Sequence, residues 1–248
     1  MVKWSYYEDH ETKNPKRPGS VLMRLNKFIA HASGKSRREA DDLIADGRIL
    51  VNGKIAKLGA QLSENLNDQE VLLDGKRLRL PLKRTLIILN KPTSYVSSRR
   101  AQAKNVKTLY ELLPSEYQKL KTVGRLDQDS SGLILLTDDG DLAFQMTHPK
   151  FVKTKIYLVQ IDHALEPLHQ QMITDFGVDL ADGKSQFMLE KLDETRKNWR
   201  VIMSEGRNRQ IRRTFAALGY AVVKLHRTDF GNYHLGDLES GKYQIVEE

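Results

Sequence analysis

The segment Thr122–Asp139 reads T-V-G-R-L-D-Q-D-S-S-G-L-I-L-L-T-D-D and places charged side chains ahead of an apolar run. Leu133–Leu136 is continuously apolar, which predicts a buried strand. Arg125, Asp127 and Asp129 precede that strand, and an unpaired carboxylate is costly to bury. The segment therefore predicts a charged turn in front of a core strand, in which Asp127 has a partner or a chemical role.

A calcium-binding loop is a second interpretation of the same segment. Positions 1, 3, 5, 6 and 12 of the loop template fall on Asp127, Asp129, Ser131, Gly132 and Asp138. Three features disagree with the template, because a leucine stands at position 9, the last ligand is Asp instead of Glu, and a strand pattern precedes the loop. The calcium interpretation is therefore disfavoured.

Composition limits the classes of protein that remain. The chain has 248 residues, 40% of them hydrophobic, with a formal net charge of +8 and no cysteine. Its pI of about 9.5 suits a polyanionic partner, and the lack of cysteine excludes disulfides, a thiol nucleophile and zinc–thiolate sites. No apolar run is long enough to cross a membrane, and residues 1–20 lack the apolar core of a secretion signal. We expect a cytoplasmic protein with no membrane partner and a flexible tail over residues 1–20.

Residues 21–80 have the pattern of a small module of helices and strands. Four apolar residues at helical spacing predict a first helix, namely Leu25, Phe28, Ile29 and Ala32. Ser36 and Glu39 form a capping-box pattern that predicts the start of a second helix, with Ala40, Leu43 and Ile44 on its inner face. The pairs Asn52-Gly53 and Asp74-Gly75 stand between short apolar runs and predict two tight hairpins.

Basic residues are concentrated in this module. Arg37 and Arg38 fall in the first turn of the second helix, where the helix dipole already favours an anion. They fit either a solvated helix start or a phosphate-binding site. The candidate RNA-binding residues are Arg24, Lys27, Lys35, Ser36, Arg37, Arg38, Asn52 and Lys54.

The run R-L-N-K-F-I-A-H-A-S-G-K-S-R-R-E-A-D-D-L-I-A-D-G-R-I-L-V-N-G-K, residues 24–54, resembles the alpha-L RNA-binding domain first seen in a small-subunit ribosomal protein. That resemblance extends over about residues 21–72. It implies that the helix pair and the hairpin at 52–54 bind structured RNA, and it implies nothing about catalysis.

Residues 84–248 follow a short linker at 81–84 and read as a second domain. Several short strand patterns are interspersed with helix patterns, without regular alternation. The predicted fold class is therefore α+β, in which a small α/β RNA-binding module precedes a catalytic domain on a mixed, mainly antiparallel sheet with flanking helices. One predicted helix, at 167–176, places Leu168, Met172 and Phe176 on its inner face.

The segment 206–228 has six basic residues and no acidic one: Arg207, Arg209, Arg212, Arg213, Lys224 and Arg227. It fits either a solvated basic helix or a surface for phosphates and base edges. A carboxylate in that positive field would have a lowered pKa and stay ionised, so Asp127 could act as a nucleophile or base. Tyr157 fits either an ordinary strand aromatic or a flat face for an extruded base. Nucleotide-binding glycine loops and nucleophile-elbow motifs are absent from the sequence.

Three runs together closely resemble the core motifs of ribosomal-RNA pseudouridine synthases: G-R-L-D-Q-D-S-S-G-L-I-L-L-T-D-D-G, K-T-K-I-Y-L-V and E-G-R-N-R-Q-I-R-R-T-F. Within that family, the chain is similar to the branch that modifies a hairpin of small- or large-subunit rRNA and carries an alpha-L domain. The resemblance implies that the N1–C1′ bond of a flipped-out uridine is broken, the uracil is turned and C5 is joined to C1′, with no cofactor. It also implies a ribosomal RNA or a ribosomal-subunit assembly intermediate as partner, and we expect a monomer.

The resemblance assigns roles residue by residue. Asp127 becomes the catalytic aspartate, Tyr157 the aromatic that stacks on the base and assists proton removal at C5, and Arg212 the arginine that pairs with the aspartate. The substrate-binding candidates are Arg125, Arg207, Asn208, Arg209, Gln210, Ile211 and Leu225. Two positions depart from the family pattern, Ser94 at a usual glycine and Gln244 at a usual arginine. A non-catalytic RNA-binding or ribosome-assembly factor, and a synthase acting on another RNA such as tRNA, are the alternatives.

Overall fold

The computed structural model of the chain describes residues 23–63, 69–81, 83–99 and 105–246. The tail expected at residues 1–20 lies outside the described residues. The chain divides into two compact units, Met1–Pro81 and Leu82–Glu248.

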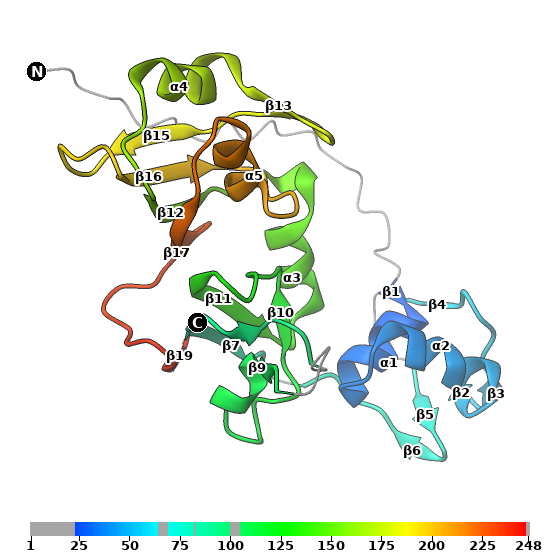
Figure 1. Cartoon of the computed structure of the whole chain (residues 1–248). Coiled ribbons are helices and arrows are strands. Elements are labelled where there is room, and N and C mark those ends of the chain that lie inside the picture. Colours follow the sequence, from blue (N-terminus) through cyan, green and yellow to red (C-terminus); the bar gives the residue numbers. More distant parts are fainter. Residues whose placement is uncertain (1–22, 64–68, 82, 100–104, 247–248) are drawn as a thin grey trace, which may run out of the picture. The chain divides into compact units, whose positions relative to one another are not determined.

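In its described residues, the first unit contains two α-helices and a small antiparallel sheet, blue to cyan in Figure 1. The helices are α1 (Leu25–Ser33) and α2 (Arg37–Ala45). The strands are β1 (Met23–Arg24), β2 (Ile49–Val51), β3 (Lys54–Ile55), β4 (Gln61–Leu62), β5 (Val71–Leu73) and β6 (Lys76–Arg77). Four strands form one sheet in the order β3-β2-β5-β6, and β1 pairs separately with β4.

The turns and caps of this unit follow from its sequence as predicted. The Ser36 hydroxyl accepts a hydrogen bond from the Glu39 N–H, and the Glu39 carboxylate accepts one from the Ser36 N–H, which completes the capping box. Asn52 and Gly53 have φ of 50° and 76°, the left-handed geometry of a tight hairpin turn. The core forms from the inner faces of α1 and α2 packed on the sheet.

The second unit is built on a nine-stranded sheet. Its main path runs β15-β16-β12-β17-β11-β7-β19, with β10 paired to β11 and β18 to β17. The strands are β7 (Leu86–Lys91), β10 (Lys121–Val123), β11 (Ser131–Thr137), β12 (Lys155–Ile161), β15 (Met188–Lys191), β16 (Asn198–Met203), β17 (Val222–Phe230), β18 (Tyr233–His234) and β19 (Tyr243–Ile245). Among the pairs described in this sheet, only β11–β17 is parallel. The mainly antiparallel sheet predicted from the sequence is confirmed.

Helices and a hairpin complete the unit. They are η2 (Leu109–Leu112), α3 (Gly140–Thr147), η3 (Pro149–Phe151), α4 (Pro167–Gln171), the π-helical turn η4 (Met172–Phe176), α5 (Gln210–Ala217), and the hairpin of β13 (Val178–Leu180) and β14 (Gly183–Ser185). Two short strands, β8 (Tyr95–Val96) and β9 (Lys107–Thr108), pair with each other. In Figure 1, α4 and α5 accompany β12, β15 and β16, whereas α3 runs beside β10 and β11.

The two halves of the sheet join through a short parallel contact. Only two positions pair there, Ser131 with His226 and Gly132 with Arg227. Gly132 has a φ of 104°, and a Cβ on it would lie 2.2 Å from the Arg227 carbonyl oxygen. Glycine is therefore required for the two backbones to approach each other, and the sheet opens beyond this point.

The helix predicted at 167–176 has a different inner face from the one expected. Leu168 and Phe176 are 62% and 61% exposed, and the side chain that enters the core from this segment is Ile173. The change from α-helix to a π-helical turn after Gln171 alters the number of residues per turn and rotates the later side chains, which explains the position of Phe176 but not that of Leu168, which precedes the turn.

Candidate active site

A cleft of about 780 Å³ opens in the second unit where the two halves of the sheet meet. Its lining includes Asp127 from the loop before β11 and Tyr157 from β12. The start of α5 contributes Arg209 and Ile211, and β17 contributes Leu225. The cleft therefore brings together residues that lie far apart in the sequence.

The Asp127 loop is held mainly by backbone contacts. The Ser130 N–H donates to the Asp127 carbonyl at 3.1 Å, and the Ser94 N–H donates to the Gln128 carbonyl at 2.7 Å. The Ser97 hydroxyl donates to the Leu126 carbonyl and accepts from the Leu126 N–H. These contacts fix the loop while the Asp127 side chain remains 34% exposed in the cleft.

Arg209 is the ion-pair partner of Asp127. Its Nη1 lies 3.5 Å from Asp127 Oδ2, and the same guanidinium donates two hydrogen bonds to the Asp129 carboxylate at 3.0 and 2.8 Å. The bonds from Arg209 are the largest cause that lowers the pKa of Asp129. Asp129 thus stays ionised and holds Arg209 against Asp127.

Arg212 does not make the pairing that the sequence predicted. Its Nε lies 3.2 Å from Asp129 Oδ2, and its Nη groups donate to the carbonyls of Asp129 and Val222. Arg212 lies one helical turn after Arg209, so it reaches the backbone behind the loop. The arginine on Asp127 is therefore Arg209, and Arg212 supports Asp129.

The apolar part of the cleft is lined by Tyr157, Ile211 and Leu225. Tyr157 is buried in the sheet and pairs across strands with Val201 and Arg227. Ile211 and Leu225 are buried and line the same cleft. A carboxylate next to apolar side chains and one aromatic ring suits a planar, uncharged base.

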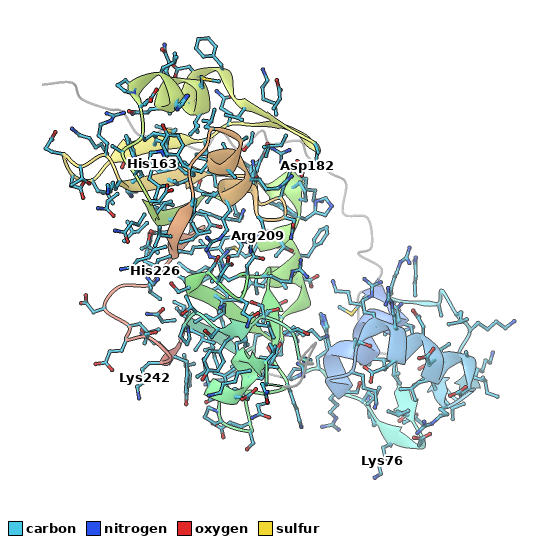
Figure 2. All side chains as sticks on the ribbon, viewed as in Figure 1. Lys76, His163, Asp182, Arg209, His226 and Lys242 are labelled. Carbon is cyan, nitrogen blue, oxygen red and sulfur yellow. The ribbon has the colours of Figure 1, made fainter. Side chains whose placement is uncertain are left out.

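Arg207 and Arg213 bind the turn of the β13–β14 hairpin through hydrogen bonds, a set of contacts that we call the clasp. Arg207 donates to the carbonyls of Asp182, Gly183 and Lys184 at 2.9, 3.0 and 2.7 Å. Arg213 donates two bonds to the Asp182 carboxylate at 2.9 and 2.8 Å, and these lower the pKa of that group. Figure 2 shows Asp182 at the tip of the hairpin and Arg209 between the two halves of the sheet. Arg207, predicted to bind substrate, lines the cleft, and its guanidinium is bonded within the protein.

The other predicted substrate-binding residues divide into two groups. Gln210 is buried, and its amide donates to Ser185 Oγ and Glu205 Oε2, so it fixes the start of α5. Arg125 and Asn208 line the cleft, and Arg125 is exposed.

Two lysines near the cleft, Lys91 and Lys155, were not singled out from the sequence. Lys91 is 0% exposed, and its ammonium donates to the carbonyls of Pro92 and Ser130. Burial lowers its pKa to about 8, against the opposing effect of the charges of Asp127 and Asp129. Its signal in the sequence is a lysine at the end of the apolar run L-I-I-L-N-K, which becomes the buried strand β7.

The half-buried Lys155 and the buried Arg227 lie together on the cleft wall. Burial, followed by the neighbouring charge of Arg227, lowers the pKa of Lys155 to about 8. The Arg227 Nε donates to the Leu133 carbonyl at 2.8 Å, which joins β17 to β11. Lys155 lies on the same strand face as Tyr157, and that position was the available signal.

The candidate RNA-binding residues of the first unit have mixed roles. Arg37 and Arg38 are exposed at the start of α2, and Arg37 donates one bond to Asn26. Ser36 caps the helix, and the Asn52 side chain accepts from the Glu70 N–H. The remaining residues are Arg24, Lys35 and Lys54, which are exposed, and Lys27, which is half-buried.

The calcium interpretation does not fit this geometry. Ser131 and Gly132 belong to β11, where Gly132 packs against the Arg227 backbone, and Asp129 is bound by two arginines. Within the described residues, no group of three or more His, Cys, Asp or Glu side chains could hold a metal ion. Over the same residues, no helix combines the length and hydropathy needed to cross a membrane.

Comparisons with known proteins define the class. Residues 85–217 match the RNA pseudouridylate synthase family, and residues 23–69 match the S4 domain. The chain therefore belongs to the RNA pseudouridylate synthase family and carries an S4 domain ahead of its catalytic unit. It is an enzyme that isomerises uridine in RNA, as the resemblance in the sequence predicted.

Particular relatives cover nearly all of the chain. It is 37% identical to the ribosomal small subunit pseudouridine synthase A of Pasteurella multocida, over 90% of this chain and 96% of the relative. It is 33% identical to the ribosomal large subunit pseudouridine synthase B of Bacillus subtilis, over 89% and 90%. Among solved structures, a pseudouridylate synthase that is 35% identical matches 91% of this chain and 96% of its own, with a TM-score of 0.63.

Proposed function

We propose that this enzyme converts one uridine of ribosomal RNA to pseudouridine, with Asp127 as the catalytic group and the target base flipped into the cleft. The observation that carries the proposal is the position of Asp127, in a cleft lined by Tyr157, Ile211 and Leu225. Ribosomal RNA is the favoured substrate because relatives covering nearly the whole chain are named for the small and large ribosomal subunits. Such a substrate also agrees with the cytoplasmic location expected from the sequence.

The reaction needs a group that acts at the sugar or the base while the base turns. The N1–C1′ bond breaks, the C5–C1′ bond forms, the proton on C5 leaves and N1 gains a proton. Nothing is oxidised or hydrolysed, so the atoms and electrons balance within the nucleotide. Asp127 is placed to act as nucleophile or base, and Arg209 orients it through an ion pair at 3.5 Å.

The surrounding side chains suit a base outside its helix. The Tyr157 ring offers a flat face on which the uracil can stack, and it is proposed to assist removal of the C5 proton. Ile211 and Leu225 exclude water from the turning base. The first unit contributes exposed cations at the start of α2 for the RNA backbone.

Asp127→Asn tests the proposal, because it keeps the shape of the side chain and removes the charge. We expect no pseudouridine on ribosomal RNA from the variant and nearly unchanged RNA binding. Asp179→Asn is the matched control, since Asp179 is exposed on β13 and does not line the cleft. Full turnover by Asp127→Asn would refute the assignment of Asp127.

The substrate is tested by mapping pseudouridines in RNA from cells with and without the gene. We expect loss of one site in ribosomal RNA. Loss of a pseudouridine in tRNA instead would show that tRNA, the alternative, is the substrate. The expected monomer stays a prediction, which the mass of the purified full chain in solution tests.

A further inference from the structure

An aromatic surface lies at the end of α3. The Phe144 side chain is 46% exposed. Its ring centroid lies 4.6 Å from that of His148 and 5.7 Å from that of Phe151. These three residues and Lys150 form what we call the α3 patch.

A lysine lies against the rings of the α3 patch. The Lys150 Nζ lies 4.7 Å from the Phe151 ring centroid and 5.5 Å from that of Phe144. No Asp or Glu occurs between Asp141 and Asp162 in the sequence. Flat rings beside cations, without nearby acidic residues in the sequence, are the composition of surfaces that bind unpaired nucleotides.

The α3 patch is continuous with the cleft. Thr147 and Pro149 line the cleft, and they alternate along the chain with His148 and Lys150 of the patch. The His148 Nδ1 accepts a bond from the Lys150 N–H at 3.3 Å and starts the turn that carries Phe151. One short segment thus presents residues to the cleft and to the patch.

We infer that the α3 patch binds the unpaired nucleotides that flank the target uridine. A base stacks on the exposed ring of Phe144, and the Lys150 ammonium contacts an adjacent phosphate. The stacking surface explains why these rings are left in solvent, and the lysine supplies charge complementarity to RNA. The inference rests on the proposed function, because it takes the cleft to be the position of the target nucleotide.

The test measures the affinity of the full chain for a labelled oligouridylate of about ten nucleotides. Phe144→Ala should raise the Kd about five- to a hundredfold, the effect of losing one base–aromatic stack. Phe144→Tyr keeps a ring and should stay within about twofold of the unmodified protein. Phe176→Ala is the matched control, because Phe176 is 61% exposed in the same unit and does not line the cleft.

Salt dependence separates the two parts of the α3 patch. Lys150→Ala should lower the slope of log Kd against log salt by about one, the effect of one lost phosphate contact, whereas Phe144→Ala should leave the slope unchanged. Thermal unfolding of each variant shows that the loss is not caused by misfolding. The inference is overturned if Phe144→Ala binds like the unmodified protein, if Phe176→Ala loses as much affinity, or if the unmodified protein does not bind the oligouridylate.

The same proteins distinguish this inference from the proposed function. If the unmodified protein forms no pseudouridine in ribosomal RNA but Phe144→Ala still weakens binding, the α3 patch stands and the substrate assignment fails. If ribosomal RNA is modified and Phe144→Ala binds the oligouridylate normally, only the patch is refuted. A protein partner for the patch would give that second result.

Discussion

The two units both have strongly basic segments but use them differently. In the first unit, Arg37 and Arg38 are exposed at the start of a helix. In the second unit, each arginine of the segment 206–228 donates hydrogen bonds within the protein, namely Arg207, Arg209, Arg212, Arg213 and Arg227. Arg37 also donates one bond, to Asn26, but Arg38 is exposed. The sequence shows the same residue type in both places, and the fold shows that the arginines of the segment 206–228 are more extensively bound within the protein.

Arg227→Met should have the largest effect on stability. The change removes the bond from Nε and leaves the Leu133 carbonyl without that donor in the centre of the sheet. We expect the free energy of unfolding to fall by about 2–3 kcal/mol, measured by urea denaturation of the full chain. The matched control is Arg38→Met, which should change stability by less than about 0.5 kcal/mol because Arg38 is exposed. Equal losses of stability in the two variants would contradict the distinction between arginines bonded within the protein and exposed arginines.

Lys91 is a buried cation of the second unit, and its burial should make the free energy of unfolding depend on pH. Its pKa is lowered from 10.5 to about 8 by burial, so between these pH values the unfolded chain binds a proton that the folded protein has released. The contribution of Lys91 to the free energy of unfolding should therefore rise as pH increases from about 8 to about 10.5. One pKa unit corresponds to about 1.4 kcal/mol, so a shift from 10.5 to about 8 corresponds to roughly 3.5 kcal/mol in total.

The measurement for Lys91 is the difference in stability between the unmodified protein and Lys91→Met at several pH values. Other groups titrate in both proteins and cancel in the difference. Lys76→Met is a control, because Lys76 is exposed and should add no slope over this range. A flat difference for Lys91→Met would show that the buried ammonium is not destabilised.

The local patterns of the chain were largely predictable from sequence. The buried strand after Asp127, the capping box at Ser36 and the turn at Asn52 all depend on residues within a few positions of one another. The clasp from Arg207 to Asp182 joins residues 25 positions apart, and no spacing rule predicts such a contact. The assignment of Arg212 as the partner of Asp127 came from the family resemblance, whereas the ion pair in the structure is formed by Arg209.

Two further errors have different causes. Phe176 was misassigned to the inner face of the segment 167–176 because a π-helical turn interrupts the α-helical period on which the prediction rested. The exposure of Leu168, which precedes that turn, has no such explanation. Lys91 was overlooked because a lysine is normally exposed, and its burial depends on two carbonyl acceptors supplied by Pro92 and Ser130.

The double variant Arg37→Ala/Arg38→Ala tests whether the exposed arginines of the first unit bind RNA. We expect affinity for a ribosomal RNA transcript to fall roughly tenfold and the salt slope to fall by about two, because two phosphate contacts are lost. Arg213→Ala is the matched variant from the second unit, and it should leave the salt slope unchanged because Arg213 is bound to Asp182. Equal changes in slope would mean that both groups of arginines contact RNA.

Ser94→Gly should have the smallest effect on stability. It changes an uncharged residue next to the loop that carries Asp127. Ser94 stands at a usual glycine of the family pattern, and the structure gives it a φ of 72° while its N–H donates to the Gln128 carbonyl. A residue with a Cβ is strained at this φ by about 1–2 kcal/mol, and replacing it by glycine relieves that strain. Part of the resulting gain in stability is offset, because glycine makes the unfolded chain more flexible and so raises the entropy lost on folding. We therefore expect the variant to be more stable by about 0.5–1 kcal/mol, measured by urea denaturation, with unchanged turnover. Ser94→Ala keeps the Cβ and should show no such gain. A gain in both variants would assign the effect to the lost hydroxyl group, whereas a loss in Ser94→Gly would show that the serine rigidifies the loop that holds Asp127.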